Sequence, residues 1–245
     1  AILELTVKIA DDVLWPNAAA GDVDEPTLVD GQVCVPRAVQ RSIAAVRNAG
    51  FLSAGLDEAR GGMQLPAVVT QTCFGVLRAA DAASVGYLML TRAAANLLGA
   101  YGSEEQKRLY MQPMHEGRYF GTMCLSEPDV GSSLGDIRSH AVPAGDGTYR
   151  LRGNKMWISG GDQDISENIV HLVLARLPDA PPGVKGISLF VVPKYRVNDD
   201  GSRGVANDIA VAGLNHKMGF RALSNCLLNF GENDGGSPID EVRTG

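Results

Sequence analysis

Two short segments of the chain combine turn residues, hydroxyls and one large aromatic side chain. Residues 123–133 (MCLSEPDVGSS) read as a strand that breaks at Pro128 and becomes a turn rich in Gly and Ser. Residues 155–161 (KMWISGG) read as a strand that presents Trp157 and then Ser159 before two glycines. Strand ends that offer backbone amides, hydroxyls and an indole suit a flat ring with polar edges, such as a flavin.

Each segment also has a purely structural interpretation. A proline forces the residue before it into an extended conformation, and residues 131–133 are then an ordinary loop. Trp157 packs in a core, and Gly160 and Gly161 turn the chain. The order and spacing of the two segments favour a shared role over two unrelated turns.

Composition excludes several classes of protein. The chain has 245 residues, a net charge of -6 and 45% hydrophobic residues, which is ordinary for a globular protein of one or two domains. Lys and Arg are scattered, so no nucleic-acid-binding surface is indicated. No apolar run reaches the ~20 residues that span a bilayer. Residues 1–10 lack the pattern of a secretory signal, so the sequence favours a cytoplasmic protein.

Other chemistries lack their motifs. Neither GxGxxG nor GxxxxGK[ST] is present, which disfavours dinucleotide and P-loop sites. Residues 131–135 (GSSLG) match GxSxG but fall in a Gly- and Ser-rich loop, so no nucleophile elbow of an α/β-hydrolase is expected. The histidines show no metal-ligand spacing, so no metal site is expected. The cysteines form no CxxC pair and are expected to be buried free thiols in a reducing compartment. Both sets are spread along the chain: His115, His140, His171 and His216; Cys34, Cys73, Cys124 and Cys226.

The first half of the chain is predicted to be helical. Apolar residues recur at helical spacing from Ile2 to a break at Trp15-Pro16, and helices are expected to begin at Pro36 and Pro66. The Ala-rich segment 82–100 reads as a buried helix. Ser103, with Gln106 three residues later, predicts a capping box before a helix that ends near residue 117.

After residue 118 the apolar period shortens to that of strands. The predicted strands are short and separated by turn chemistry, which favours an antiparallel β-barrel or sandwich. They cover residues 120–125, 138–142, 149–158, 169–175, 187–192, 209–211 and 227–230. The expected fold class is therefore α+β and multidomain: an N-terminal helical bundle (1–117), a middle antiparallel β domain (118–234) and a polar linker (235–245).

Four motifs in order resemble the flavin-dependent acyl-CoA dehydrogenase family. Residues 124–132 resemble the family's first signature and residues 154–160 its second flavin-contacting strand. Residues 186–192 and 216–222 resemble later segments of the family's β domain. Besides these four motifs, residues 101–107 resemble the start of one of the family's helices. The similarity covers nearly the whole chain. Residues 164–193 further resemble the branch that contains 3-methylmercaptopropionyl-CoA dehydrogenases.

The resemblance implies an FAD site and a reaction. Family members remove an α-proton with a carboxylate while a hydride leaves the β-carbon for flavin N5. By resemblance, the backbone at Met123 and Leu125 and the Ser126 hydroxyl contact the pyrimidine edge of FAD. Trp157 flanks the ring system and Ser159 reaches N5.

The resemblance also implies a substrate contact and partners. Ser132 is expected near the FAD pyrophosphate or the pantetheine arm of acyl-CoA. Family traits further imply electron-transfer flavoprotein or a similar acceptor, and a homo-oligomer.

The chain departs from the family pattern in two respects. Ser133 stands where the signature usually has Asp. Family members continue into a second helical domain that usually supplies the catalytic base, so no catalytic residue is assigned, and neither Glu127 nor Glu232 matches the base position. The chain is therefore expected to be inactive alone. Two alternatives remain: a non-enzymatic folded fragment, and a flavin-binding DNA-damage-response member, which would need a basic C-terminal surface that this sequence lacks.

Overall fold

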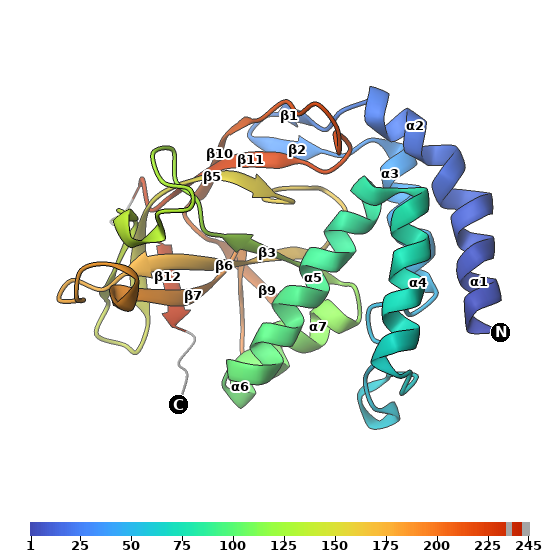
Figure 1. The fold of residues 1–245 in the computed structure, drawn as a ribbon. Helices are drawn as coiled ribbons and strands as arrows, with labels where there is room; N and C mark the ends of the chain where they lie inside the picture. Colours follow the sequence, from blue (N-terminus) through green and yellow to red (C-terminus); the bar gives the residue numbers. More distant parts are fainter. Residues whose placement is uncertain (234–236, 242–245) are drawn as a thin grey trace.

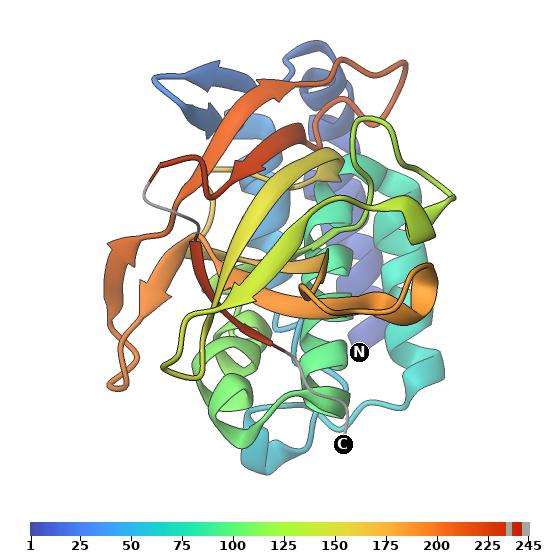
Figure 2. The same ribbon diagram turned by 90° about the vertical axis from the view of Figure 1, so that its left-hand side faces the viewer.

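The computed structural model describes residues 1–233 and 237–241. Helices from the first half of the chain form one layer, and a curled sheet from the second half packs against it (Figure 1). Figure 2 views the sheet face, with the helices behind it. This arrangement confirms the expected α+β fold class.

The N-terminal helix continues beyond its predicted end. α1 (Ile2–Ile9), a π-helical turn (Ala10–Leu14) and α2 (Trp15–Val23) follow one another without a break. The prediction of a stop at Trp15-Pro16 was wrong. A proline ring normally clashes with the carbonyl four residues earlier, but the wider π turn just before Pro16 changes that geometry, and Trp15 N–H bonds Ala10 instead.

The other predicted helices are confirmed. Pro36 and Pro66 each precede a helix, and the Ser103–Gln106 capping box has both of its hydrogen bonds. Asp81 caps the longest helix by accepting from Ser84 N–H at 3.0 Å. The elements are α3 (Arg37–Asn48), α4 (Ala67–Ala80), α5 (Ala82–Tyr101), α6 (Glu104–Gln106), a second π turn (Lys107–Met111) and α7 (Gln112–His115).

The sheet is mixed rather than antiparallel. Its order is β10-β11-β5-β12-β7-β6-β3, with β4 against β5 and β6, and β3 runs parallel to β6. The chain between β3 and β6 passes through the long connection 125–139 and then through β4 and β5, which leaves room for this parallel pairing. The strands are β3 (Tyr119–Cys124), β4 (His140–Pro143), β5 (Tyr149–Ser159), β6 (Asn168–Arg176), β7 (Ile187–Pro193), β10 (Ile209–Leu214), β11 (Asn225–Phe230) and β12 (Ser237–Glu241).

Five strands were not predicted. β1 (Thr27–Val29) and β2 (Gln32–Cys34) form a hairpin in the helical half, and β8 (Tyr195–Val197) pairs with β9 (Arg203–Ala206). β12 pairs with β5 and β7. The predicted linker over 235–245 thus contains a strand, while residues 235–236 and 242–245 of that prediction lie outside the described residues.

Helix α5 lies directly on β3 and fixes the two layers to each other. Gly121 N–H donates to the Thr91 hydroxyl at 3.1 Å, inside the core. A Cβ at Gly121 would lie 2.5 Å from the Ala94 methyl, so only glycine permits this approach. The end of β3, where the first candidate segment begins, is therefore held rigidly against α5.

Candidate functional site

The structure joins the two segments singled out in the sequence. The turn after β3 lies against β5, and Met156 N–H donates to the Ser126 carbonyl at 3.0 Å. Ser126 is half-buried, and the next residue along β5, Trp157, is 56% exposed. The Ser126 turn and the end of β5 consequently form one surface, which we call the seat (residues 125–127 and 156–159).

A β-bulge turns Trp157 outward. Ile158 pairs with Cys226 and Lys155 with Leu228, so two residues of β5 oppose one residue of β11. Trp157 has a φ of +64°, a left-handed conformation that is unfavourable for a bulky side chain. The strained backbone holds the indole on the seat instead of in the core, where the structural interpretation of the sequence had placed it.

Ser159 opens onto an apolar cavity of about 330 Å³ between α5 and the 216–223 loop. Its hydroxyl is 3.5 Å from the Asn225 amide nitrogen. The other lining residues come from α4, α5 and the loop: Arg78, Gly86, Met89, Leu90, Ala93, Phe220 and Leu223. None of these described lining residues is a carboxylate.

Tyr87 fastens the 216–223 loop to α5 on the inner side of that cavity. Its buried hydroxyl donates to the Ala222 carbonyl at 3.1 Å and accepts from Ser224 N–H at 2.8 Å. Burial raises the pKa of Tyr87 well above its ordinary value, so the hydroxyl stays protonated and keeps both bonds. The cavity wall next to Ser159 is therefore a fixed part of the fold.

A buried ion pair lies beneath the seat. Lys155 is 0% exposed, and its Nζ donates to Glu127 Oε1 at 2.9 Å and to the Leu125 carbonyl at 3.1 Å. Glu127 also accepts the N–H groups of Arg138 at 2.7 Å and Ser139 at 3.0 Å. Burial alone would raise the pKa of Glu127, but these donors outweigh it and lower the pKa. The ionised side chains of Lys155 and Glu127 thus hold the 125–127 turn against β5.

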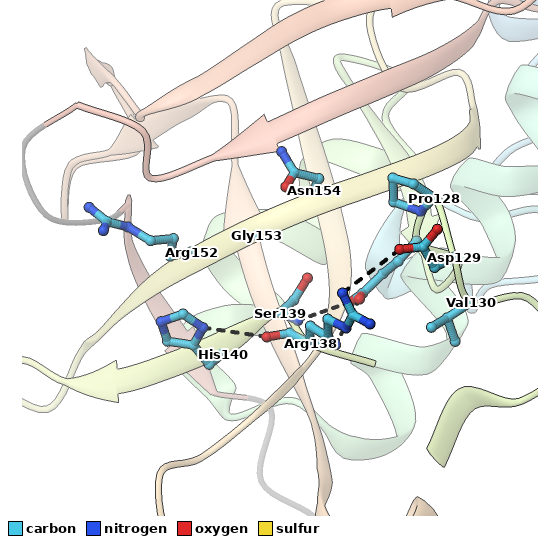
Figure 3. Close-up of a pocket in the computed structure, with 10 residues that line it drawn as sticks. Pro128, Asp129, Val130, Arg138, Ser139, His140, Arg152, Gly153 and Asn154 are labelled. Carbon is cyan, nitrogen blue, oxygen red and sulfur yellow. Dashed lines mark hydrogen bonds and ion pairs between the residues drawn. The ribbon is translucent and has the colours of Figure 1, made fainter. Parts of the chain in front are cut away.

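A second cavity, of about 280 Å³, is lined by Glu127 of this pair and by residues 128–130, 138–140 and 152–154 (Figure 3). Its rim carries charges that already have partners: Arg138 lies 3.8 Å from the Asp129 carboxylate, and Arg152 Nε donates to the Gly231 carbonyl at 3.0 Å. Ser139, shown below Gly153 in Figure 3, is buried at its inner wall. We assign this cavity no ligand.

The remaining sequence-predicted residues lie near the seat to different degrees. Met123 and Leu125 are half-buried at the end of β3 and at the start of the turn. Ser132 is exposed on the loop that follows. Arg176 holds the next part of that loop by donating to the carbonyls of Ile137 and Gly135. The structure thus brings Ser126 and Trp157 together, places Ser159 at the apolar cavity, and leaves Ser132 exposed on the loop outside both cavities.

The structure also bears on metals, thiols and membranes. Within residues 1–233 and 237–241, no group of three His, Cys, Asp or Glu side chains is placed to hold a metal ion. All four cysteines are free, but Cys34 is exposed, so the prediction of buried thiols was wrong at that position. The described helices include none with the length and apolar character that crossing a bilayer requires.

Family models match both halves of the chain. The model described as acyl-CoA dehydrogenase, N-terminal domain, matches residues 1–118, and the one described as acyl-CoA dehydrogenase, middle domain, matches residues 122–233. The chain belongs to the acyl-CoA dehydrogenase family.

Curated relatives agree with this assignment. A 3-methylmercaptopropionyl-CoA dehydrogenase of Ruegeria pomeroyi is 37% identical over 245 residues, which are 100% of this chain and 42% of the relative. A butyryl-CoA dehydrogenase of Syntrophomonas wolfei is 35% identical over 98% of this chain and 41% of the relative. The chain therefore spans about two fifths of the length of these relatives.

Solved structures share the fold. An acyl-CoA dehydrogenase from Bacillus anthracis, solved as a complex with FAD, superimposes with a TM-score of 0.73 at 21% identity. It covers 100% of this chain, which corresponds to 36% of that protein. The architecture of helical layer and curled sheet is thus the one that the family uses.

Sequence reasoning missed the parts of the site that are defined by three-dimensional packing. In the sequence Lys155 stands out only as part of the motif over residues 154–160, although its complete burial makes it the link between the two segments. The apolar lining from Met89, Leu90 and Phe220 carries no signal of its own, because such residues look like core. A lysine inside an otherwise alternating strand was the one available sequence signal.

Proposed function

We propose that this chain forms the FAD- and acyl-CoA-binding part of a flavin-dependent acyl-CoA dehydrogenase. The observation that carries the proposal is the seat: the Ser126 turn bonded to β5, beside an exposed Trp157 and an apolar cavity at Ser159. Ligand sites are typically concave and mostly apolar with a few convergent polar groups, and this arrangement fits that description.

The residues present fit a flavin. Ser126 offers a hydroxyl and a backbone N–H that has no hydrogen-bond acceptor among the described residues. Met123 and Leu125 supply backbone next to it, and Trp157 presents an indole face. Bound FAD would supply a two-electron acceptor. The protein's part is to aim donors at the pyrimidine edge, to flank the ring with Trp157 and to place Ser159 near N5.

The apolar cavity suits the acyl part of a thioester. Met89, Leu90 and Leu223 would surround the acyl chain and exclude water, and Ser159, which lines the same cavity, would face the flavin. Ser132, exposed on the loop after the turn, would contact the pyrophosphate or the pantetheine arm. The described lining offers no carboxylate to hold the α-proton, so we assign no catalytic base within this cavity.

The whole protein's context follows from family membership. We infer a division into a helical domain (1–117) and a β domain (118–234), electron transfer to an electron-transfer flavoprotein or similar acceptor, a homo-oligomer and a cytoplasmic location. Neither a nucleic-acid partner nor a membrane span is part of this proposal.

Titration of FAD into the purified chain tests the site. The adjacent serines Ser132 and Ser133 are both exposed on one loop, yet the proposal gives a role to Ser132 alone. We expect Ser132→Ala to weaken FAD or CoA-ester binding about 5- to 20-fold, as loss of one hydrogen bond does, and Ser133→Ala to leave both unchanged. FAD binding is monitored by the quenching of fluorescence. If no FAD binding is observed, the proposal is refuted.

A further inference from the structure

The buried Lys155 does more than join two segments, because one of its bonds goes to a peptide of the seat. Its Nζ donates to the Leu125 carbonyl at 3.1 Å, and that carbonyl belongs to the same peptide group as the Ser126 N–H. The Ser126 N–H points to no acceptor among the described residues. A cation is thus bonded to one end of a peptide whose other end is an unused donor.

A hydrogen bond from a cation polarises the peptide that accepts it. Withdrawal of electrons by the ammonium at Leu125 makes the Ser126 N–H a stronger donor, because successive hydrogen bonds reinforce each other and their effect is larger where water is absent. Lys155 is 0% exposed and Glu127 6%, so solvent does not screen this effect. Glu127 opposes it by neutralising part of the charge on Lys155.

We propose that the Lys155–Glu127 pair sets the reduction potential of the flavin, acting through the Leu125–Ser126 peptide. The inference rests on the proposed function, since it requires the pyrimidine edge to lie at Ser126. Lys155 touches no cofactor atom in this arrangement and is a positioning residue. Its bond strengthens the donor that faces negative charge on the reduced ring, so it raises the potential, and Glu127 moderates the rise.

The test compares three variants of the FAD-loaded chain by redox titration at pH 6. Lys155→Met removes the bond to Leu125 and should lower the midpoint potential. Glu127→Gln keeps the bond and removes the opposing charge, so it should raise the potential. Lys194→Met is the matched control, because Lys194 pairs with the buried Asp162 in the same domain but does not bond the seat.

The expected size follows from the donor's strength. A tenfold change in the preference of the site for reduced over oxidised flavin shifts a two-electron potential by about 30 mV. We expect shifts of that order and opposite sign for K155M and E127Q, and no comparable shift for K194M. Shifts of the same sign, or shifts no larger than that of K194M, would overturn the inference.

A flavin-free readout separates this inference from the proposed function. In the apo chain, the amide proton resonance of Ser126 should move upfield in K155M and downfield in E127Q, and stay in place in K194M. If FAD does not bind but the resonance moves as stated, the proposed function fails while the polarisation stands. If K155M does not fold, K155M/E127Q replaces it, since it leaves no buried charge and retains an acceptor for the Arg138 and Ser139 N–H groups. An unmoved Ser126 resonance refutes the inference in either case.

Discussion

Trp157 shows how a single residue can be kept in an unfavourable conformation. Its φ of +64° lies in the region that L-residues with bulky side chains avoid. The bulge that produces this φ also turns the indole toward the proposed flavin position. The residue therefore exchanges local backbone stability for an exposed aromatic surface, as is found at binding sites.

This strain predicts that glycine at position 157 gives a more stable protein than alanine does, which is the reverse of the usual order within a strand. Both Trp157→Ala and Trp157→Gly remove the indole, but only glycine relaxes at positive φ. We expect W157G to be more stable than W157A by about 1 kcal/mol in urea unfolding. At Arg152 in the same strand, where φ is not positive, alanine should be the more stable of the pair. Equal or reversed stabilities at Trp157 would show that the bulge imposes no strain.

Glu127 predicts a specific pH dependence. Its pKa is held below the ordinary value of 4.5, so the carboxylate stabilises the fold above that pH and the contribution is lost as pH falls through the lower, folded-state pKa. Glu127→Gln should cost about 3 kcal/mol near pH 7, because it leaves Lys155 buried without its counter-charge. The difference from the wild type should shrink as the solution is acidified from pH 5 toward pH 3.

Urea unfolding at several pH values measures this difference. Asp179→Asn is the control, because Asp179 is an exposed carboxylate in the same half of the chain. Its difference from the wild type should stay small at every pH. A gap between E127Q and wild type that stays constant down to pH 3 would contradict the role assigned to Glu127.

The residues of the site differed in how far the sequence alone could predict them. Ser126, Trp157 and Ser159 could be proposed as site residues from the sequence because they lie in motifs that follow one another in a set order. Glu127 was visible in the same motif, but its pairing with Lys155, 28 positions away, depends on how β5 lies beside the turn. Such a contact has no local signature, so it emerged only with the fold.

At the scale of elements, two glycines in neighbouring helices have different surroundings. Gly75 in α4 is exposed, and a Cβ there would meet no atom within 4 Å. Gly86 in α5 faces the apolar cavity, and a Cβ there would lie 2.9 Å from Leu223 Cδ2. The first position has no packing reason to be glycine, whereas the second leaves room for the cavity wall.

Alanine substitutions should separate these two cases. Gly75→Ala should stabilise the protein by about 0.5–1 kcal/mol, since it removes backbone freedom from the unfolded chain and improves helix propensity. Gly86→Ala has the same intrinsic advantage but must displace Leu223, so we expect little or no net gain in urea unfolding. An equal gain at both positions would mean that Leu223 moves freely and that the cavity wall is soft.

Helices were easier to predict than strands for a physical reason. The start of α3 after Pro36 and the box at Ser103 are encoded within a few residues. The hairpin around Asp30-Gly31 also had a local turn signal, but its strands are only three residues long and mostly exposed. Strands that short carry too few residues to show an alternating pattern, and their pairing is decided by neighbours far along the chain.

For the whole molecule too, features encoded locally could be predicted from the sequence, and long-range pairings could not. The change from helices to strands near residue 118 was readable, because apolar period is a local property. The parallel pairing of β3 with β6 was not, since it joins residues about fifty positions apart. The candidate site lies between α5, the end of β3 and the bulge in β5. It therefore depends both on locally encoded elements and on long-range strand pairing.

The whole-molecule arrangement also predicts what the chain lacks on its own. Dehydrogenation of an acyl thioester needs a base at the α-carbon, and the described lining of the apolar cavity contains no carboxylate. A positioned base contributes roughly 10²–10⁴-fold by proton transfer. We therefore expect the FAD-loaded 245-residue chain to keep its oxidised flavin absorbance after anaerobic mixing with straight-chain acyl-CoA esters.

Two controls make that result informative. Dithionite should bleach the same sample, which shows that the flavin can be reduced. Acetate at molar concentration should then produce slow bleaching with acyl-CoA, because a free carboxylate can take the α-proton, although without the advantage of being held in place. Rapid bleaching without acetate would place a base within these residues. The rate of bleaching would then fall when the carboxylate that reaches the cavity in the substrate complex is substituted. Bleaching that needs acetate would instead show that this chain provides the electron acceptor and the substrate pocket, and that the proton acceptor must come from elsewhere.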